Sequence, residues 1–129
     1  VAWSEAISNF TAAHNAKMLA TNPPQQFHSN SFDRRIALIN AGVNLRLAAG
    51  EKITSENVFG YGKSALHTFA AFVIDWERGG PNGMRADLGH RVAISNADFE
   101  QLGQSITSFA GTGFGPQVTT QVFANRGRV

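Results

Sequence analysis

Residues 102–124 read LGQSITSFAGTGFGPQVTTQVFA, and this stretch decides the fold class. Residues 102, 104, 106 and 108 would share one side of an extended chain, and residues 118, 120, 122 and 124 form a second such run. The glycine-rich segment 111–116 lies between the two runs. Two alternating runs joined in this way predict an antiparallel β-hairpin. A phosphate-binding loop would need a helix after its glycines, whereas here a strand follows and Pro116 removes a backbone donor.

The first part of the chain has a helical pattern instead. Ser4 is a good N-cap, and large side chains recur after it at helical spacing, which predicts a helix over residues 4–19 with one buried face. The pair Pro23-Pro24 ends this helix, because proline lacks the backbone donor and restricts the residue before it. The recurring side chains are Ile7, Phe10, His14 and Met18.

Two more helices are predicted in the middle of the chain. Ser31 is a candidate N-cap for a short helix that ends at Gly42, a residue suited to the left-handed position after a helix. Ser64 is the candidate N-cap of the clearest helix. The residues predicted to form the buried stripe of that helix are Leu66, Phe69, Ala70, Val73 and either Trp76 or Glu77.

Between these helices, residues 53–59 are predicted to be extended, and the glycines of 60–62 are predicted to turn the chain. A further short helix is predicted at about 88–94. Helices early and strands late predict an α+β layered fold. With 129 residues and neither a repeat nor a linker, we expect one domain over 1–129.

Composition excludes several classes of function. Hydrophobic residues make up 43% and charged residues 16% of the chain, which is the balance of a compact globule. The net charge is only +2 and no basic stripe exists, so nucleic-acid binding is not expected. The absence of cysteine excludes disulfides and iron–sulfur clusters. No apolar run approaches the roughly 20 residues of a membrane span, and no signal-peptide pattern is present.

Three polar residues are candidates for a functional site. His28 and His90 stand in predicted loops in polar company, and Glu56 enters a predicted strand, where an acid needs a partner. The start of a helix next to His90 disfavours imidazolium and leaves a neutral ring that can bind metal or accept a proton. The alternatives are exposed loop histidines and a salt-bridged acid. His14 is predicted to be a core histidine, and His67 a partly exposed one with no role.

Short motifs follow one another along nearly the whole chain. They are Trp3 with AHNAKM at 13–18, FH at 27–28 with SFDR at 31–34 and AG at 41–42, SENV at 55–58, GHR at 89–91 with Ile94, Asn96 and Phe99, LG at 102–103, and TQVF at 120–123. In this order they resemble the CAP superfamily, the SCP-like extracellular domain, in its bacterial branch.

The resemblance implies a three-layer α–β–α sandwich around a central, mainly antiparallel sheet. It also implies an open groove where two histidines and one or two acids meet, which in this chain are His28, His90 and Glu56. Two neutral imidazoles and a carboxylate suit a divalent metal such as zinc. Glu56 is then a third ligand or the acceptor of a proton from metal-bound water. The resemblance further implies a secreted, periplasmic or cell-surface location.

The chain also departs from the family. Ser55 replaces the usual glycine before the acid. The second acid that many eukaryotic members carry has no clear counterpart, and Asp75 and Glu77 are the nearest candidates. The family's first helix has no counterpart before Trp3.

Three functions stay open at this point. The first is a secreted or surface-attached module that binds an extracellular ligand, such as a lipid, a small molecule or a metal. The second is a metal-dependent hydrolase acting at His28, Glu56 and His90, although no nucleophile or oxyanion signature accompanies them. The third is a structural domain of a larger surface protein, in which these three residues only stabilise the fold.

Overall fold

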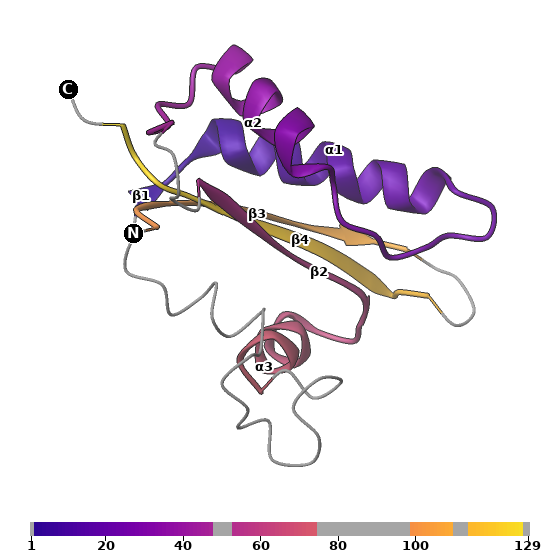
Figure 1. The fold of residues 1–129 in the computed structure, drawn as a ribbon. Helices are drawn as coiled ribbons and strands as arrows, with labels where there is room; N and C mark the ends of the chain where they lie inside the picture. The colour runs from indigo at the N-terminus through magenta and orange to yellow at the C-terminus, as the bar shows by residue number, and fades with distance from the viewer. Residues whose placement is uncertain (1, 48–52, 75–98, 110–113, 128–129) are drawn as a thin grey trace.

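A computed structural model of the chain describes residues 2–47, 53–74, 99–109 and 114–127. The elements in chain order are β1 (Ala2–Trp3), α1 (Glu5–Ala20), α2 (Ser31–Asn40), β2 (Thr54–Gly62), α3 (Ala65–Ile74), β3 (Gln101–Ser108) and β4 (Gln117–Ala124). The strands form one sheet in the order β1-β3-β4-β2 (Figure 1). The predicted α+β class is therefore confirmed, with three helices and a four-stranded mixed sheet in this part of the chain.

Strands β3 and β4 form the predicted antiparallel hairpin. Their register runs from Gln101 opposite Ala124 to Ser108 opposite Gln117. Strand β4 also pairs antiparallel with β2, so it lies inside the sheet, and its residues after Gln117 are all buried. The two-residue β1 pairs in parallel with β3, which makes the sheet mixed.

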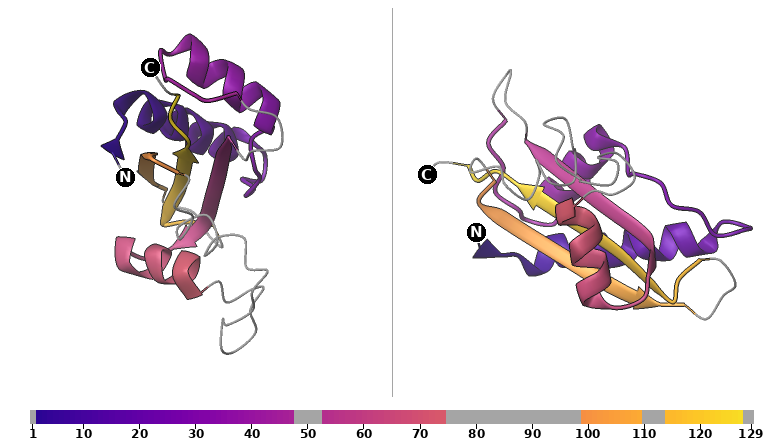
Figure 2. Two further views of the ribbon diagram at one scale, coloured as in Figure 1. Left: turned by 60° about the vertical axis from the view of Figure 1, so that its left-hand side comes forward. Right: turned by 90° about the horizontal axis from the view of Figure 1, so that it is seen from below.

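Helices lie on both faces of the sheet. Figures 1 and 2 show α1 and α2 over one face and α3 on the other. Helix α1 packs closely on β3 because Gly103 has no side chain, and a Cβ there would overlap the backbone nitrogen of Ser8. The core on this face is built from two groups of buried side chains. They are Ile7, Leu38, Val43, Val122 and Ala124 in one group, and Met18, Val58, Phe114 and Val118 in the other.

The first helix agrees closely with its prediction. Ser4 is its N-cap, and the Ser4 hydroxyl accepts a hydrogen bond from the Ile7 amide at 3.2 Å. The buried face also carries polar residues, which the apolar pattern did not predict. Asn15 is fully buried, and its hydrogen bonds compensate for the loss of water. Its amide nitrogen donates to the Ser105 carbonyl at 3.0 Å, and its amide oxygen accepts from the Thr120 hydroxyl at 2.6 Å.

Helix α2 begins one residue earlier than predicted, because it has a different N-cap. The side chain of Asn30, not of Ser31, accepts hydrogen bonds from the amides of Phe32 and Asp33, both at 3.0 Å. Asparagine caps as well as serine does, and the cap lies one residue earlier than predicted. Gly42 follows the helix with φ +89°, so its predicted left-handed conformation is confirmed.

Two predictions in the middle of the chain are wrong. Strand β2 does not turn at residues 60–62 but continues to Gly62, with a shift in register after Phe59. In α3 two residues of the stripe that was predicted to be buried are exposed: Leu66 is 77% and Phe69 is 54% accessible.

The sheet meets α3 through Thr68 and Phe72 instead, because Phe59 of β2 packs edge-to-face against Phe72. Ser64 is confirmed as a cap, since its hydroxyl accepts from the His67 amide at 3.0 Å. The short helix predicted at 88–94 lies outside the described residues, as do Asp75, Trp76 and Glu77. None of the described helices is both long and apolar enough to cross a bilayer.

Candidate functional site

Two of the three predicted site residues meet in the structure. Glu56 lies on β2 and His28 in the segment between α1 and α2, and His28 Nδ1 is 3.1 Å from Glu56 Oε1. The Glu56 side chain is 1% exposed, whereas that of His28 is 59% exposed. The third residue, His90, lies outside the described residues.

Two residues that sequence reasoning missed hold Glu56 in place. The Ser29 amide donates to Oε1 at 2.7 Å, and the Ser29 hydroxyl donates to Oε2 at 2.6 Å. Arg34 Nη1 lies 3.7 Å from Oε1 and donates to the Ser29 hydroxyl at 2.8 Å. Arg34 is itself buried and donates through Nε to the Thr54 hydroxyl at 3.0 Å. The SFDR motif carried Arg34, but nothing in the sequence showed that it reaches Glu56.

These contacts decide the charge of Glu56. Burial raises the pKa of the carboxyl, but hydrogen bonds from His28 and Ser29 and the positive charge of Arg34 outweigh burial, so the pKa is lowered overall. Burial also lowers the pKa of Arg34, while Glu56 raises it and the neighbouring Arg35 lowers it further. Glu56 is therefore a carboxylate at neutral pH, paired with a buried guanidinium.

The ionised carboxylate fixes the orientation and tautomer of His28. A carboxylate only accepts hydrogen bonds, so His28 Nδ1 must carry a hydrogen to bond with Glu56. When the ring is neutral, its lone pair is then on Nε2. A histidine held by a carboxylate through one nitrogen is the usual form of a metal ligand or a proton acceptor.

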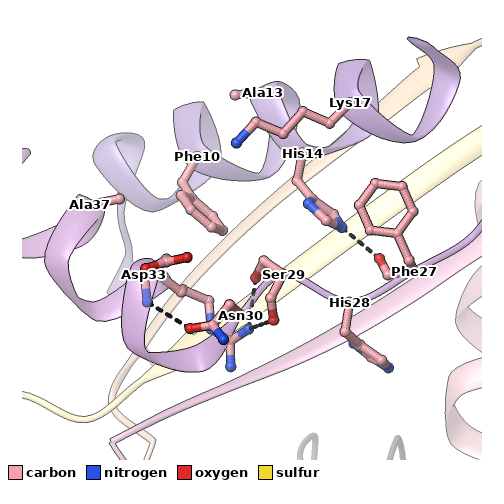
Figure 3. A pocket seen from close by; sticks show the side chains of 11 residues that line it. Phe10, Ala13, His14, Lys17, Phe27, His28, Ser29, Asn30, Asp33 and Ala37 are labelled. Atoms are coloured by element: carbon pink, nitrogen blue, oxygen red, sulfur yellow. Dashed lines mark hydrogen bonds between the residues drawn. The ribbon is translucent and has the colours of Figure 1, made fainter. Parts of the chain in front are cut away.

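His14 positions the segment that carries His28. It projects from α1 toward Phe27 (Figure 3), its Nε2 donates to the Phe27 carbonyl at 2.7 Å, and the two rings meet edge-to-face at 5.1 Å. His14 is 3% exposed, so its predicted place in the core is confirmed. His67, as predicted, is only partly exposed, and its Nδ1 accepts from the Lys63 amide.

Two pockets adjoin His28. The first, about 500 Å³, lies between α1 and α2 and is lined by Phe10, Ala13, Phe27 and Ala37, with Lys17 and Asp33 among its polar residues (Figure 3). The second, about 330 Å³, is bordered by Glu56 and the start of β2. His28, Ser29 and Arg34 line both pockets. The sequence did not predict the first pocket, whereas the second adjoins His28 and Glu56, where the family resemblance implies an open groove.

The described residues do not by themselves make up a metal centre. His28 has the orientation of a ligand, but both oxygens of Glu56 accept hydrogen bonds from Ser29 and His28 and its side chain is buried. Within the described ranges, no group of three or more histidine or acidic side chains is placed to hold a metal ion. Glu56 is thus better suited to orient His28 than to bind a metal.

Comparison of the chain with protein-family models, with curated proteins and with solved structures finds no match.

Proposed function

We propose that this chain is a secreted or cell-surface domain of the CAP superfamily that binds a small or lipid-like extracellular ligand beside His28. The observation that carries the proposal is the hydrogen bond between His28 and the buried Glu56, two residues that the family resemblance requires to meet. Helices on both faces of the sheet support a three-layer α–β–α sandwich (Figure 2).

The pocket between α1 and α2 is the proposed ligand site. Binding pockets typically measure about 300–1,000 Å³ and combine apolar walls with a few polar groups. This pocket, at about 500 Å³, has two phenylalanine rings and two alanines in its wall and His28 and Arg34 among its polar residues. Such a site suits a ligand with an apolar body and one polar end.

A divalent metal such as zinc is the alternative ligand in this proposal. His28 and His90 would hold the ion through their imidazoles, and Glu56 would fix the His28 ring by its hydrogen bond to Nδ1. When bound, such an ion supplies Lewis acidity and lowers the pKa of its water. Zinc titration by calorimetry of the wild type, His28→Ala and His90→Ala tests this alternative, and equal binding by all three contradicts it.

The apolar ligand is tested with a fluorescent fatty-acid probe, cis-parinaric acid. Ala13 and Ala12 are both exposed on α1, but only Ala13 lines the pocket. Ala13→Trp fills the pocket and should weaken probe binding about tenfold or more, whereas the matched control Ala12→Trp should leave it unchanged. Failure of the wild type to bind the probe, or equal binding by both variants, contradicts the proposed ligand site.

The pKa and the burial of Glu56 make it a poor general base, so they support the hydrolase alternative less well. A general base should have a pKa near the working pH, whereas the pKa of Glu56 is lowered and its side chain is buried. Turnover on panels of peptides, esters and glycans that is lost in His28→Ala would favour the hydrolase. If neither zinc, nor the probe, nor any substrate is bound, the remaining alternative is a structural domain of a larger surface protein.

A further inference from the structure

The pocket between α1 and α2 contains two opposite charges that the protein leaves unpaired. Lys17 lines it from α1 and Asp33 lines it from α2. Both residues are exposed, and neither forms an ion pair with the other or with another described residue. Figure 3 shows Lys17 extending from α1 toward Phe10, with Asp33 on the far side of that ring. Within the described part of the chain, this pocket therefore presents an unpaired cation and an unpaired anion from its two helices.

Most of the other polar side chains of this pocket are already bonded within the protein. Arg34 is compensated by Glu56 at 3.7 Å, and its Nη1 donates to the Ser29 hydroxyl at 2.8 Å. The side-chain oxygen of Asn30 caps α2. His14 donates to a backbone carbonyl. A ligand in this pocket therefore meets apolar walls and, beside them, the two unpaired charges.

The balance of these charges disfavours a ligand with a net charge. With Arg34 compensated by Glu56 and histidine counted as neutral, Lys17 and Asp33 leave the lining without net charge. A ligand with a carboxylate alone is attracted by Lys17 but repelled by Asp33, and a ligand with an ammonium group alone meets the reverse. A ligand that carries both charges can place each of them near its opposite.

We propose that this pocket binds an amphipathic zwitterion, a molecule with an apolar body and a head that carries one cation and one anion. The apolar body packs against Phe10 and Phe27. The anionic group faces Lys17, and the ammonium group faces Asp33. The volume of about 500 Å³ is in the range of pockets that hold such small molecules. The inference rests on the proposed function, because it names the class of ligand that the same site takes.

The test is calorimetry of the wild-type chain with three amphiphiles that share a decyl chain, each below its micelle concentration. They are decanoate, which is an anion, decyltrimethylammonium, which is a cation, and decylphosphocholine, which is a zwitterion. Decylphosphocholine should bind about fivefold more tightly than either of the others, since it adds one favourable charge contact and avoids one repulsion.

Two exposed substitutions should change this selectivity in opposite directions. Asp33→Asn should weaken decylphosphocholine about fivefold and strengthen decanoate, because the repulsion of the carboxylate is removed. Lys17→Gln should weaken decylphosphocholine by a similar factor and strengthen decyltrimethylammonium. Glu5→Gln and Lys63→Gln are the matched controls, because they remove the same charges from exposed residues that do not line the pocket. Both should bind all three amphiphiles as the wild type does.

L-Phenylalanine, a zwitterion without an alkyl chain, distinguishes the source of the ligand. Binding of decylphosphocholine indicates a lipid, and binding of L-phenylalanine alone indicates an apolar amino acid. The inference is overturned if the wild type binds neither zwitterion, if it binds all three amphiphiles equally tightly, or if Asp33→Asn and Lys17→Gln leave zwitterion binding unchanged. In each of these cases, binding of cis-parinaric acid that Ala13→Trp weakens still supports the proposed ligand site. Failure of both the zwitterions and cis-parinaric acid to bind contradicts the site itself.

Discussion

Glu56 and Asn57 are neighbours on β2, and their side chains belong to two buried polar networks of different character. Glu56 lies on the face that α1 and α2 cover and is held by Ser29, Arg34 and His28. Asn57 bonds across the opposite face, where its amide donates to Gln121 Oε1 at 2.9 Å and Gln121 donates to Gln104 Oε1 at 2.9 Å. Among the contacts of the described residues, the Glu56 network carries charges and the Asn57 network consists of amides.

The two networks also end differently. The amide ladder joins β2, β4 and β3, and it ties three strands together through neutral groups. The Glu56 network ends at His28, whose side chain is 59% exposed beside two pockets. Buried polar groups stabilise the fold when they satisfy one another's hydrogen bonds. A network that joins buried charges to an exposed imidazole can also contact a ligand. On this basis we expect the Asn57 network to serve stability, and the Glu56 network is the one that we propose to serve ligand binding.

The largest expected effect comes from removing the charge of Glu56. Glu56→Gln leaves the buried Arg34 without a counter-charge, so the free energy of unfolding should fall by about 3–5 kcal/mol at neutral pH. Urea denaturation measures it. Glu100→Gln, an equal charge change at an exposed residue, should stay within about 0.5 kcal/mol of the wild type. Equal stability of Glu56→Gln and the wild type would contradict the conclusion that the Glu56 network, unlike the Asn57 network, depends on a buried charge pair.

A smaller effect is expected in the neutral network. Gln121→Ala removes two hydrogen bonds from the ladder and should lower the free energy of unfolding by about 1–3 kcal/mol. This loss should be the same at pH 4 and pH 7, because no member of the ladder titrates. A loss that depends on pH would show that the two networks are coupled through β2.

The smallest effect is a difference in pH dependence. The pKa of Glu56 is lowered from its ordinary value of 4.5 on folding, so its contribution to stability is present above pH 4.5 and is lost as the pH falls below it. Below that pH, the unfolding free energy of the wild type should fall more steeply than that of Glu56→Gln, by at most about 1.4 kcal/mol per pH unit. Parallel pH profiles would contradict the assignment of charge to Glu56.

Local patterns predicted the elements well. Alternation in residues 102–108 and 118–124 predicted the hairpin, and helical spacing predicted α1 and α2, although the cap of α2 is Asn30 and not Ser31. The predicted burial of Leu66 in α3 was wrong, because periodicity identifies an apolar face but not the surface against which it packs. Phe59 of β2 packs against Phe72, and Leu66 is exposed. The continuation of β2 through residues 60–62 depended on pairing with β4, which glycine content alone does not encode.

The site was predicted only in part. The contact between His28 and Glu56 was expected from the family resemblance, since the residues are 28 positions apart and no local rule joins them. Ser29 and Arg34 were missed because their roles arise from the path of the chain between α1 and α2. Ligation of a metal by His28, Glu56 and His90 stays a prediction.

The most direct test of the account is the tautomer of neutral His28, read from long-range ¹H–¹⁵N correlation spectra of the wild-type chain. The hydrogen bond to the Glu56 carboxylate predicts a protonated Nδ1 and an unprotonated Nε2, the reverse of the usual preference of free histidine. Observation of a protonated Nε2 in the neutral ring would contradict the account, because Glu56 would then not orient His28 and the exposed nitrogen could neither accept a proton nor bind a metal.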